Sequence, residues 1–406
     1  MAIYVFLNFP TFGQVNPTLA IVRELVVRGQ EVVYFTGEVF RDAIEAAGAR
    51  FCPYPVEAPL FHRESRTANP DEDHNRRLAL LSFGMLKASR QMVPLLLDAV
   101  RAQGPDILVY SDLFLWARII AHALSLPGVT LRPTYASNAS FRRRMLEGTD
   151  LAAKQPWPVW IAEEMRHLKD TYHLPFADTT SLFRGDEGLR IVFLPRAFQL
   201  DGGAFDERYL FVGPSFNPER DKQYRRGEFP FERMRCRPRV YISLGTIFNS
   251  RPEFYRLCFD AFGDQDREVI LSLGHQIDPA SLVPVPANFI TAPHVPQLEI
   301  LPQTDVFITH GGMNSTMESL YFGVPVIVIP HTNEQTLTAE RVETLGLGIA
   351  LNEAGLTKDT LQKAVARILD EPAFGVRVRS MQKEVREAGG YLKATDALQA
   401  YAGNML

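Results

Sequence analysis

The sequence has few cysteines, little net charge and no long apolar run. Only three cysteines, Cys52, Cys236 and Cys258, occur in 406 residues, and none of them form a C-x-x-C pair. Neither a disulfide framework nor a zinc site is therefore expected. The formal net charge of -4 gives no electrostatic basis for binding nucleic acid or an anionic membrane surface.

Membrane and export signals are also lacking. No stretch approaches the roughly 20 apolar residues that a membrane-spanning helix needs. The opening "MAIYVFLNFP" lacks the basic start of a secretory signal peptide. We therefore expect no integral membrane segment and a cytoplasmic location. The length exceeds what one hydrophobic core usually sustains, so two domains are expected.

What the sequence does contain is a repeated strand–helix pattern. Residues 3–7 are apolar without alternation, as in a strand buried on both faces. Asn16 and Pro17 predict the N-cap and first turn of the following helix, and Gly29 predicts its end. Another apolar strand follows at residues 31–35. Because the pattern recurs in both halves, an α/β fold with two Rossmann-like, doubly wound parallel-sheet domains is predicted.

The composition also predicts where these domains end. A segment rich in proline, glycine and charge interrupts the pattern near residue 220 and is typical of a linker. The predicted parts are an N-terminal domain at 1–215, a linker at 216–238, a C-terminal domain at 239–385 and a final helix at 386–406. Ligands of open α/β sheets lie outside the carboxyl ends of the strands.

The motif "ITHGGMNSTMES" predicts an anion site in the C-terminal domain. Gly311 and Gly312 follow an apolar strand and allow close backbone approach, and a helix starting near Asn314 directs its unpaired N–H groups outward. Ser315 and His310 add side-chain donors, so the group suits a diphosphate. The competing interpretation is that Asn314 and Ser315 only cap a helix.

Long stretches of the chain resemble the family 1 glycosyltransferases of GT-B fold, in particular the bacterial macrolide-type group that uses UDP-sugars. The resemblance is carried by "LNFPTFGQVNPTLAIVRELVVRGQEV", "FVGPS" and "VPQLEILPQTDVFITHGGMNSTMESLYFGVPVIVIPHTNEQTLTAERV". It implies two domains facing across a cleft, with the final helix crossing back onto the first domain. It implies no cofactor and no metal ion, since the UDP-sugar is a co-substrate.

The resemblance assigns donor-binding roles by position. The diphosphate would be held by His310, Gly311, Gly312, Asn314 and Ser315, with Thr246 opposite. The nucleoside would be held by Glu318 at the ribose hydroxyls and by Gln297 and His294 beside the base, and the sugar by Glu334 and Gln335. One departure concerns His294, because many relatives stack the base on a tryptophan there, and an imidazole stacks over less area.

The reaction centre departs from the family pattern at both of its positions. Relatives have a histidine base in G-H-x-x-P, whereas this chain has Gln14, whose amide cannot take a proton. The aspartate that orients the base is expected at residue 111, where the chain has Ser111 followed by Asp112. Gln14 and Asp112 are therefore the candidate residues of the reaction centre, and only Asp112 of the two could act as a base.

Three explanations of this departure stay open. Asp112 reaches the acceptor through a local bulge, or the acceptor is already ionised and needs no base, or the protein binds a nucleotide sugar without turning it over. The sequence favours the enzyme: an inverting transfer of a hexose, expected to be glucose from UDP-glucose, to a small hydrophobic or aromatic acceptor such as a macrolide or a phenolic. An epimerase acting on a UDP-sugar is a further rival class.

The acceptor side is the least determined by the sequence. In relatives, segments corresponding to 56–100 and 133–185 line an apolar acceptor pocket. Their aromatic residues are individually more consistent with core packing. The basic run at 142–144 is more consistent with a solvated helix face than with an anion site, although it could attract an anionic acceptor.

Overall fold

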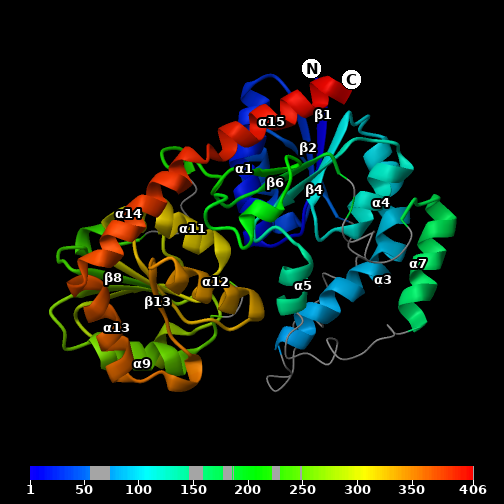
Figure 1. The fold of residues 1–406 in the computed structure, drawn as a ribbon. Coiled ribbons are helices and arrows are strands. Elements are labelled where there is room, and N and C mark those ends of the chain that lie inside the picture. Colours follow the sequence, from blue (N-terminus) through cyan, green and yellow to red (C-terminus); the bar gives the residue numbers. More distant parts are fainter. Residues whose placement is uncertain are drawn as a thin grey trace. The chain divides into compact units, whose positions relative to one another are not determined.

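The computed structural model describes residues 1–54, 74–145, 159–176, 185, 187–221, 229–246 and 249–405. The chain divides into two compact units (Figure 1). The first comprises Met1–Phe216 with Gly389–Leu406, and the second comprises Asn217–Ala388.

The first unit contains a seven-stranded parallel sheet with the strand order β3-β2-β1-β4-β5-β6-β7. Its strands are β1 (Ile3–Leu7), β2 (Glu31–Thr36), β3 (Arg50–Pro53), β4 (Ile107–Ser111), β5 (Gly128–Arg132), β6 (Leu189–Val192) and β7 (Tyr209–Phe211). The order reverses between β1 and β4, so the carboxyl ends of these two strands form the switch point where ligands of such sheets bind.

Helices cover both faces of this sheet. They are α1 (Phe12–Val27), α2 (Arg41–Ala46), α3 (His74–Arg101), α4 (Leu115–Ala123), α5 (Ala139–Met145), α7 (Val159–Tyr172) and α15 (Gly390–Met405). Along β1, Tyr4 and Phe6 pack in one core with residues of α1 and α15, while Val5 and Leu7 pack in another with residues of α3, α4 and α7. The absence of alternation in β1 therefore reflects burial on both faces, as predicted.

The predicted start of α1 is wrong. The helix begins at Phe12 with Thr11 in the N-cap position, and Pro17 lies inside it. Proline forfeits the hydrogen bond that its N–H would make. Here the early turns are held instead by burial of Val15, and by the Thr18 hydroxyl, which donates to the Val15 carbonyl at 2.7 Å. Gln14 consequently belongs to the first helical turn rather than to a loop.

The second unit contains a six-stranded parallel sheet with the order β10-β9-β8-β11-β12-β13. Its strands are β8 (Arg239–Ser243), β9 (Glu268–Ser272), β10 (Phe289–Ala292), β11 (Val306–Thr309), β12 (Val326–Val328) and β13 (Gly348–Ala350). The order reverses between β8 and β11. The loops after these two strands therefore meet at the switch point of this unit.

The helices of the second unit are α9 (Pro252–Phe262), α10 (Gln297–Ile300), α11 (Met313–Phe322), α12 (Asn333–Thr344), α13 (Lys358–Asp370) and α14 (Pro372–Glu387). Helix α11 packs on α14, and α9 packs on α13. Residues 217–221 and 229–238, expected as part of a linker, belong to this unit. The Arg235 N–H, for example, donates to the Glu268 carboxylate at 2.8 Å.

Single 3-10 turns complete the description: η1 (Glu38–Phe40), η4 (Gly202–Ala204), η6 (Phe231–Arg233), η7 (Pro279–Leu282), η8 (Leu301–Gln303) and η9 (Glu353–Gly355). None of the helices in the described part of the chain combines the length and the apolar character that crossing a bilayer needs.

Candidate functional site

The junction between β11 and α11 has the backbone shape that the sequence predicted for an anion site. Gly311 has a φ of 83°, and a Cβ added there would lie 2.6 Å from Val328 Cγ1. Both the left-handed backbone and the close approach therefore require glycine. Gly312 occupies the N-cap position of α11, without a side-chain cap. The helix begins at Met313, and the N–H groups of its first turn have no acceptor within the helix.

The imidazole of His310 is held between two glycines. A Cβ added at Gly245 would lie 2.5 Å from His310 Cε1, and one added at Gly312 would lie 2.5 Å from Nε2. Burial lowers the pKa of His310 to about 4, and the nearby His331 acts in the same direction, whereas a hydrogen bond to the backbone of Ser243 opposes them. His310 is therefore neutral at pH 7. A neutral imidazole donates only one hydrogen bond, so His310 offers an anion at this junction one neutral donor rather than a positive charge.

Gln297 connects the residues expected to contact the nucleoside and the phosphate. Its Nε2 donates to Ser315 Oγ at 3.2 Å and to the Glu318 carboxylate at 2.5 Å, while its Oε1 accepts from the Tyr241 hydroxyl at 3.2 Å. Ser315 and Glu318 are three residues apart on α11 and so share one face of the helix. The sequence did not predict a role for Tyr241, because a tyrosine within a buried strand is indistinguishable from an ordinary core residue.

Glu318 has a strongly perturbed carboxyl group. Burial raises its pKa to about 7, the Gln297 amide acts in the opposite direction, and Asp221 raises the pKa further. At neutral pH the carboxyl is therefore divided between its protonated and ionised forms. A ligand that offers two hydroxyl donors favours the ionised form, because a carboxylate accepts hydrogen bonds from both.

The predicted placement of the ribose hydroxyls on Glu318 implies that UDP binding strengthens by about tenfold between pH 6 and pH 8, because the ionised carboxylate accepts from both hydroxyls and its pKa is about 7. Isothermal titration calorimetry at a series of pH values measures this. The Glu318→Gln variant is the control, since it retains the titration of UDP itself and loses that of residue 318. An identical pH dependence in both proteins would remove Glu318 from the binding site.

The residues expected to contact the sugar lie at the start of α12. Thr332 caps this helix by accepting from the Gln335 N–H at 3.3 Å, and Gln335 Oε1 accepts from the His331 N–H at 2.7 Å. Gln335 is 8% exposed, so its side-chain oxygen already serves the local backbone and a sugar would contact its amide nitrogen. Glu334 precedes it and is partly buried.

Two further predicted residues lie in exposed positions of the same unit. Thr246 is exposed and closely follows β8, the strand beside β11, which brings it to the same switch point as His310. His294 is exposed and lies between β10 and α10. Gln297 begins α10, so a short loop connects the residue expected to stack on the base with the one that holds Glu318.

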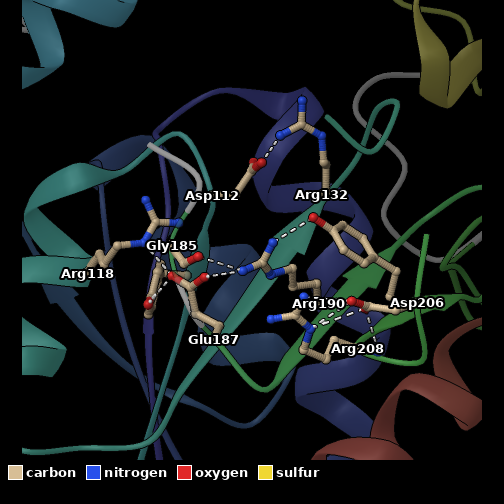
Figure 2. Close-up of polar contacts among 10 residues, drawn as sticks. Asp112, Arg118, Arg132, Gly185, Glu187, Arg190, Asp206 and Arg208 are labelled. Atoms are coloured by element: carbon tan, nitrogen blue, oxygen red, sulfur yellow. Dashed lines mark hydrogen bonds and ion pairs between the residues drawn. The ribbon is translucent and has the colours of Figure 1, made fainter. Parts of the chain in front are cut away.

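In the first unit, the two candidate catalytic residues follow neighbouring strands. The Gln14 N–H donates to the Thr11 carbonyl at 3.0 Å in the first turn after β1. Ser111 ends β4, and its hydroxyl oxygen accepts from the Leu113 N–H at 3.4 Å. The Asp112 carboxylate forms an ion pair with Arg132 at the end of β5 (Figure 2). Arg132 was not singled out in the sequence, where it is one arginine at a strand end.

The aromatic residues of the acceptor segments mostly belong to the core. Phe114 and Trp116 are fully buried, Phe141 and Phe176 are each 7% exposed, and Trp160 is 38% exposed. Residues 56–73, 146–158 and 177–184 of these segments lie outside the described residues, including Phe61 and Trp157. The basic run lies on α5, where Arg142 donates to Ser137 Oγ at 3.4 Å. Over the described ranges, no group of three or more His, Cys, Asp or Glu side chains could hold a metal ion.

Two parallel-sheet Rossmann-like units, with a glycine-rich turn and a helix N-terminus at the switch point of the second, are the architecture of the GT-B glycosyltransferases. The C-terminal domain model of the erythromycin biosynthesis protein CIII-like family matches residues 256–388. NDP-glycosyltransferase YjiC of Bacillus subtilis is 39% identical over 97% of this chain and 96% of its own length. The uncharacterized UDP-glucosyltransferase YojK of the same organism is 31% identical over 98% of this chain and 97% of its own length.

A solved structure agrees with these relatives. The calicheamicin glycosyltransferase CalG4 superposes with a TM-score of 0.82 and 31% identity, covering 99% of this chain and 98% of that one. The chain belongs to the GT-B glycosyltransferase family of these proteins, and it is a glycosyltransferase.

Proposed function

We propose that this glycosyltransferase transfers glucose from UDP-glucose to a small, apolar or aromatic acceptor, with inversion at the anomeric carbon. The observation that carries the proposal is the arrangement around α11. Backbone N–H groups at its N-terminus and the Glu318 carboxyl on its second turn lie on one helix. Together they match the diphosphate and ribose of a nucleotide sugar.

The choice of UDP-glucose is supported by the name of YojK, an uncharacterized UDP-glucosyltransferase, and by the Glu334–Gln335 pair at the start of α12. A carboxylate beside an amide accepts from one sugar hydroxyl and donates to the next. The acceptor class is supported by the name of CalG4, the calicheamicin glycosyltransferase. The cytoplasmic location stays a prediction from the sequence.

The chemistry proposed for this site is a direct displacement without a metal ion. The charge that develops on the leaving diphosphate is stabilised by the helix N-terminus and its amides. Positioning of the two substrates supplies about 7–11 kcal/mol of rate enhancement, against a few kcal/mol from a general base. Transfer without a histidine base is therefore slower but retained.

Mass spectrometry of a reaction with UDP-glucose, EDTA and a mixed panel of phenolic and carboxylic acceptors tests the proposal. The expected products are heavier than their acceptors by the mass of one hexosyl group. They are expected to form at the same rate with and without EDTA. Binding of UDP-glucose without any product or hydrolysis would favour a nucleotide-sugar-binding protein that lacks turnover. Conversion of the UDP-sugar without an acceptor would favour an epimerase.

A further inference from the structure

The ion pair between Asp112 and Arg132 places a fixed cation beside the expected reaction centre. Asp112 follows β4, Arg132 ends β5, and the helix that carries Gln14 follows β1. These three strands are consecutive neighbours in the sheet, and adjacent strands are about 4.8 Å apart. The Arg132 side chain reaches across to Asp112 and therefore toward the switch point. The two side chains keep 12% and 18% of their surface exposed.

The Arg132 guanidinium is held by groups other than Asp112. Its Nε donates to the Tyr135 carbonyl, and its charged carbon lies 5.7 Å from the centre of the Phe141 ring. Tyr135 is itself fully buried and stacks on Phe198 with ring centroids 6.0 Å apart. The Arg132 guanidinium is therefore positioned independently of Asp112. Another carboxylate could replace Asp112 as its partner without moving the guanidinium.

The neighbouring loop is fixed in the same way. Gln199 Oε1 accepts from the Ala136 N–H at 2.8 Å, and Gln199 Nε2 donates to the Ala136 carbonyl at 3.2 Å. Both hydrogen bonds are buried. The backbone that carries the Tyr135 carbonyl therefore cannot move without breaking them, so the position of the Arg132 guanidinium is set before any ligand arrives.

A second arginine–carboxylate group in the same unit serves as a contrast (Figure 2). Glu187 pairs with Arg118 and Arg190, and it accepts from the Tyr110 hydroxyl at 2.9 Å. Burial acts to raise the pKa of Glu187, but the two arginines outweigh it and lower the pKa overall. All three charged side chains are less than 10% exposed. That group is a closed structural network, whereas the Asp112–Arg132 pair at the carboxyl ends of β4 and β5 keeps part of both side chains exposed.

We infer that Arg132 recognises the carboxylate of an acidic acceptor, with the acceptor replacing Asp112 as the partner of the guanidinium. The inference rests on the proposed function and names the acceptor class of that same site. A planar guanidinium binds carboxylates through two parallel N–H donors. Asp112 then forms the ion pair with Arg132 only while no acceptor is bound, and it is not the base that removes a proton.

The chemistry of a carboxylic acceptor explains the residue at position 14. A carboxylate with an ordinary pKa near 4 is ionised at pH 7. Its oxygen forms the bond to the anomeric carbon, the bond from that carbon to the diphosphate oxygen breaks, and the electron pair leaves with UDP. No proton is transferred. The side chain of Gln14, which cannot accept a proton, therefore imposes no penalty on this reaction.

The test compares 2-naphthoate with 2-naphthol, which share one ring system and differ in the acceptor group. In the Arg132→Met variant, kcat/KM for 2-naphthoate is expected to fall about 10- to 100-fold, chiefly through KM, as expected for loss of a charge-assisted hydrogen bond. The value for 2-naphthol is not expected to fall, because a neutral hydroxyl forms no bidentate ion pair with the guanidinium. The Asp112→Asn variant, which removes the competing carboxylate, is expected to lower KM for 2-naphthoate.

Calorimetric binding of 2-naphthoate without a donor makes the result independent of the donor site. Affinity is expected to fall in Arg132→Met, to be partly retained in Arg132→Lys and to rise in Asp112→Asn. Failure of the proposed function would appear separately, as absent UDP binding. Unchanged 2-naphthoate affinity in Arg132→Met and Arg132→Lys, or equal losses for both naphthyl acceptors, would overturn the inference. If Arg132→Met does not fold, unchanged affinity in Arg132→Lys and Asp112→Asn would do so.

Discussion

The Gly311→Ala variant is expected to lose UDP affinity by about 100-fold, which corresponds to the loss of one or two hydrogen bonds to a charged group. The backbone φ of 83° at this residue is disfavoured for alanine, and the new Cβ would lie 2.6 Å from Val328 Cγ1. The junction must therefore shift, and the N–H groups at the start of α11 move away from the diphosphate. Calorimetric titration with UDP measures the loss.

Gly323 at the other end of α11 provides a matched control. Its φ is 77°, and an added Cβ would lie 2.8 Å from the flexible amide of Gln382. A denaturant titration is therefore expected to show that Gly323→Ala lowers the free energy of unfolding by about 1–2 kcal/mol, as Gly311→Ala does. Gly323→Ala should leave UDP affinity unchanged. Equal UDP affinities in the two variants would show that the anion does not bind at the start of this helix.

The Gln14→His variant is expected to accelerate transfer to 2-naphthol by about 10²- to 10⁴-fold, the usual contribution of a general base. A phenol with a pKa near 10 must lose its proton during the reaction, and an imidazole can accept it. Transfer to 2-naphthoate is expected to change by less than about threefold, because that acceptor has no proton to lose. Steady-state kinetics with both acceptors measures the difference.

A result in which histidine accelerates neither acceptor would locate the base elsewhere in the chain. Asp112 would then be the first candidate, and a large loss of 2-naphthol turnover in Asp112→Asn would support it. The present geometry disfavours that assignment, because the Arg132 ion pair competes with any acceptor hydroxyl for the Asp112 carboxylate.

The backbone of the donor site could be predicted from the sequence because it depends on local rules. Adjacent glycines between a buried strand and a helix already indicate a close backbone approach. Gly311 has the positive φ that such an approach requires, and Gly323 ends the helix in a left-handed conformation. Strands such as β1, β2 and β11 were likewise recognisable, since their apolar residues do not alternate. The short strands β3 and β13 were not predicted.

The side-chain network around that backbone could not be predicted, because it joins residues far apart in the chain. Tyr241 and Gln297 are 56 residues apart, and neither differs by type from an ordinary core or surface residue. Arg132 and Asp112 meet because β4 and β5 are neighbours in the sheet, a pairing that propensity does not specify. The start of α1 was misplaced because burial of Val15 outweighed the usual preference for proline in the first turn.

The most direct test of the account is a crystal structure of the complex with UDP. We expect diphosphate oxygens within about 2.7–3.2 Å of backbone nitrogens at the start of α11. We also expect both ribose hydroxyls to donate hydrogen bonds to the Glu318 carboxylate. A nucleotide bound anywhere other than the loops at the carboxyl ends of β8 and β11 would contradict the account.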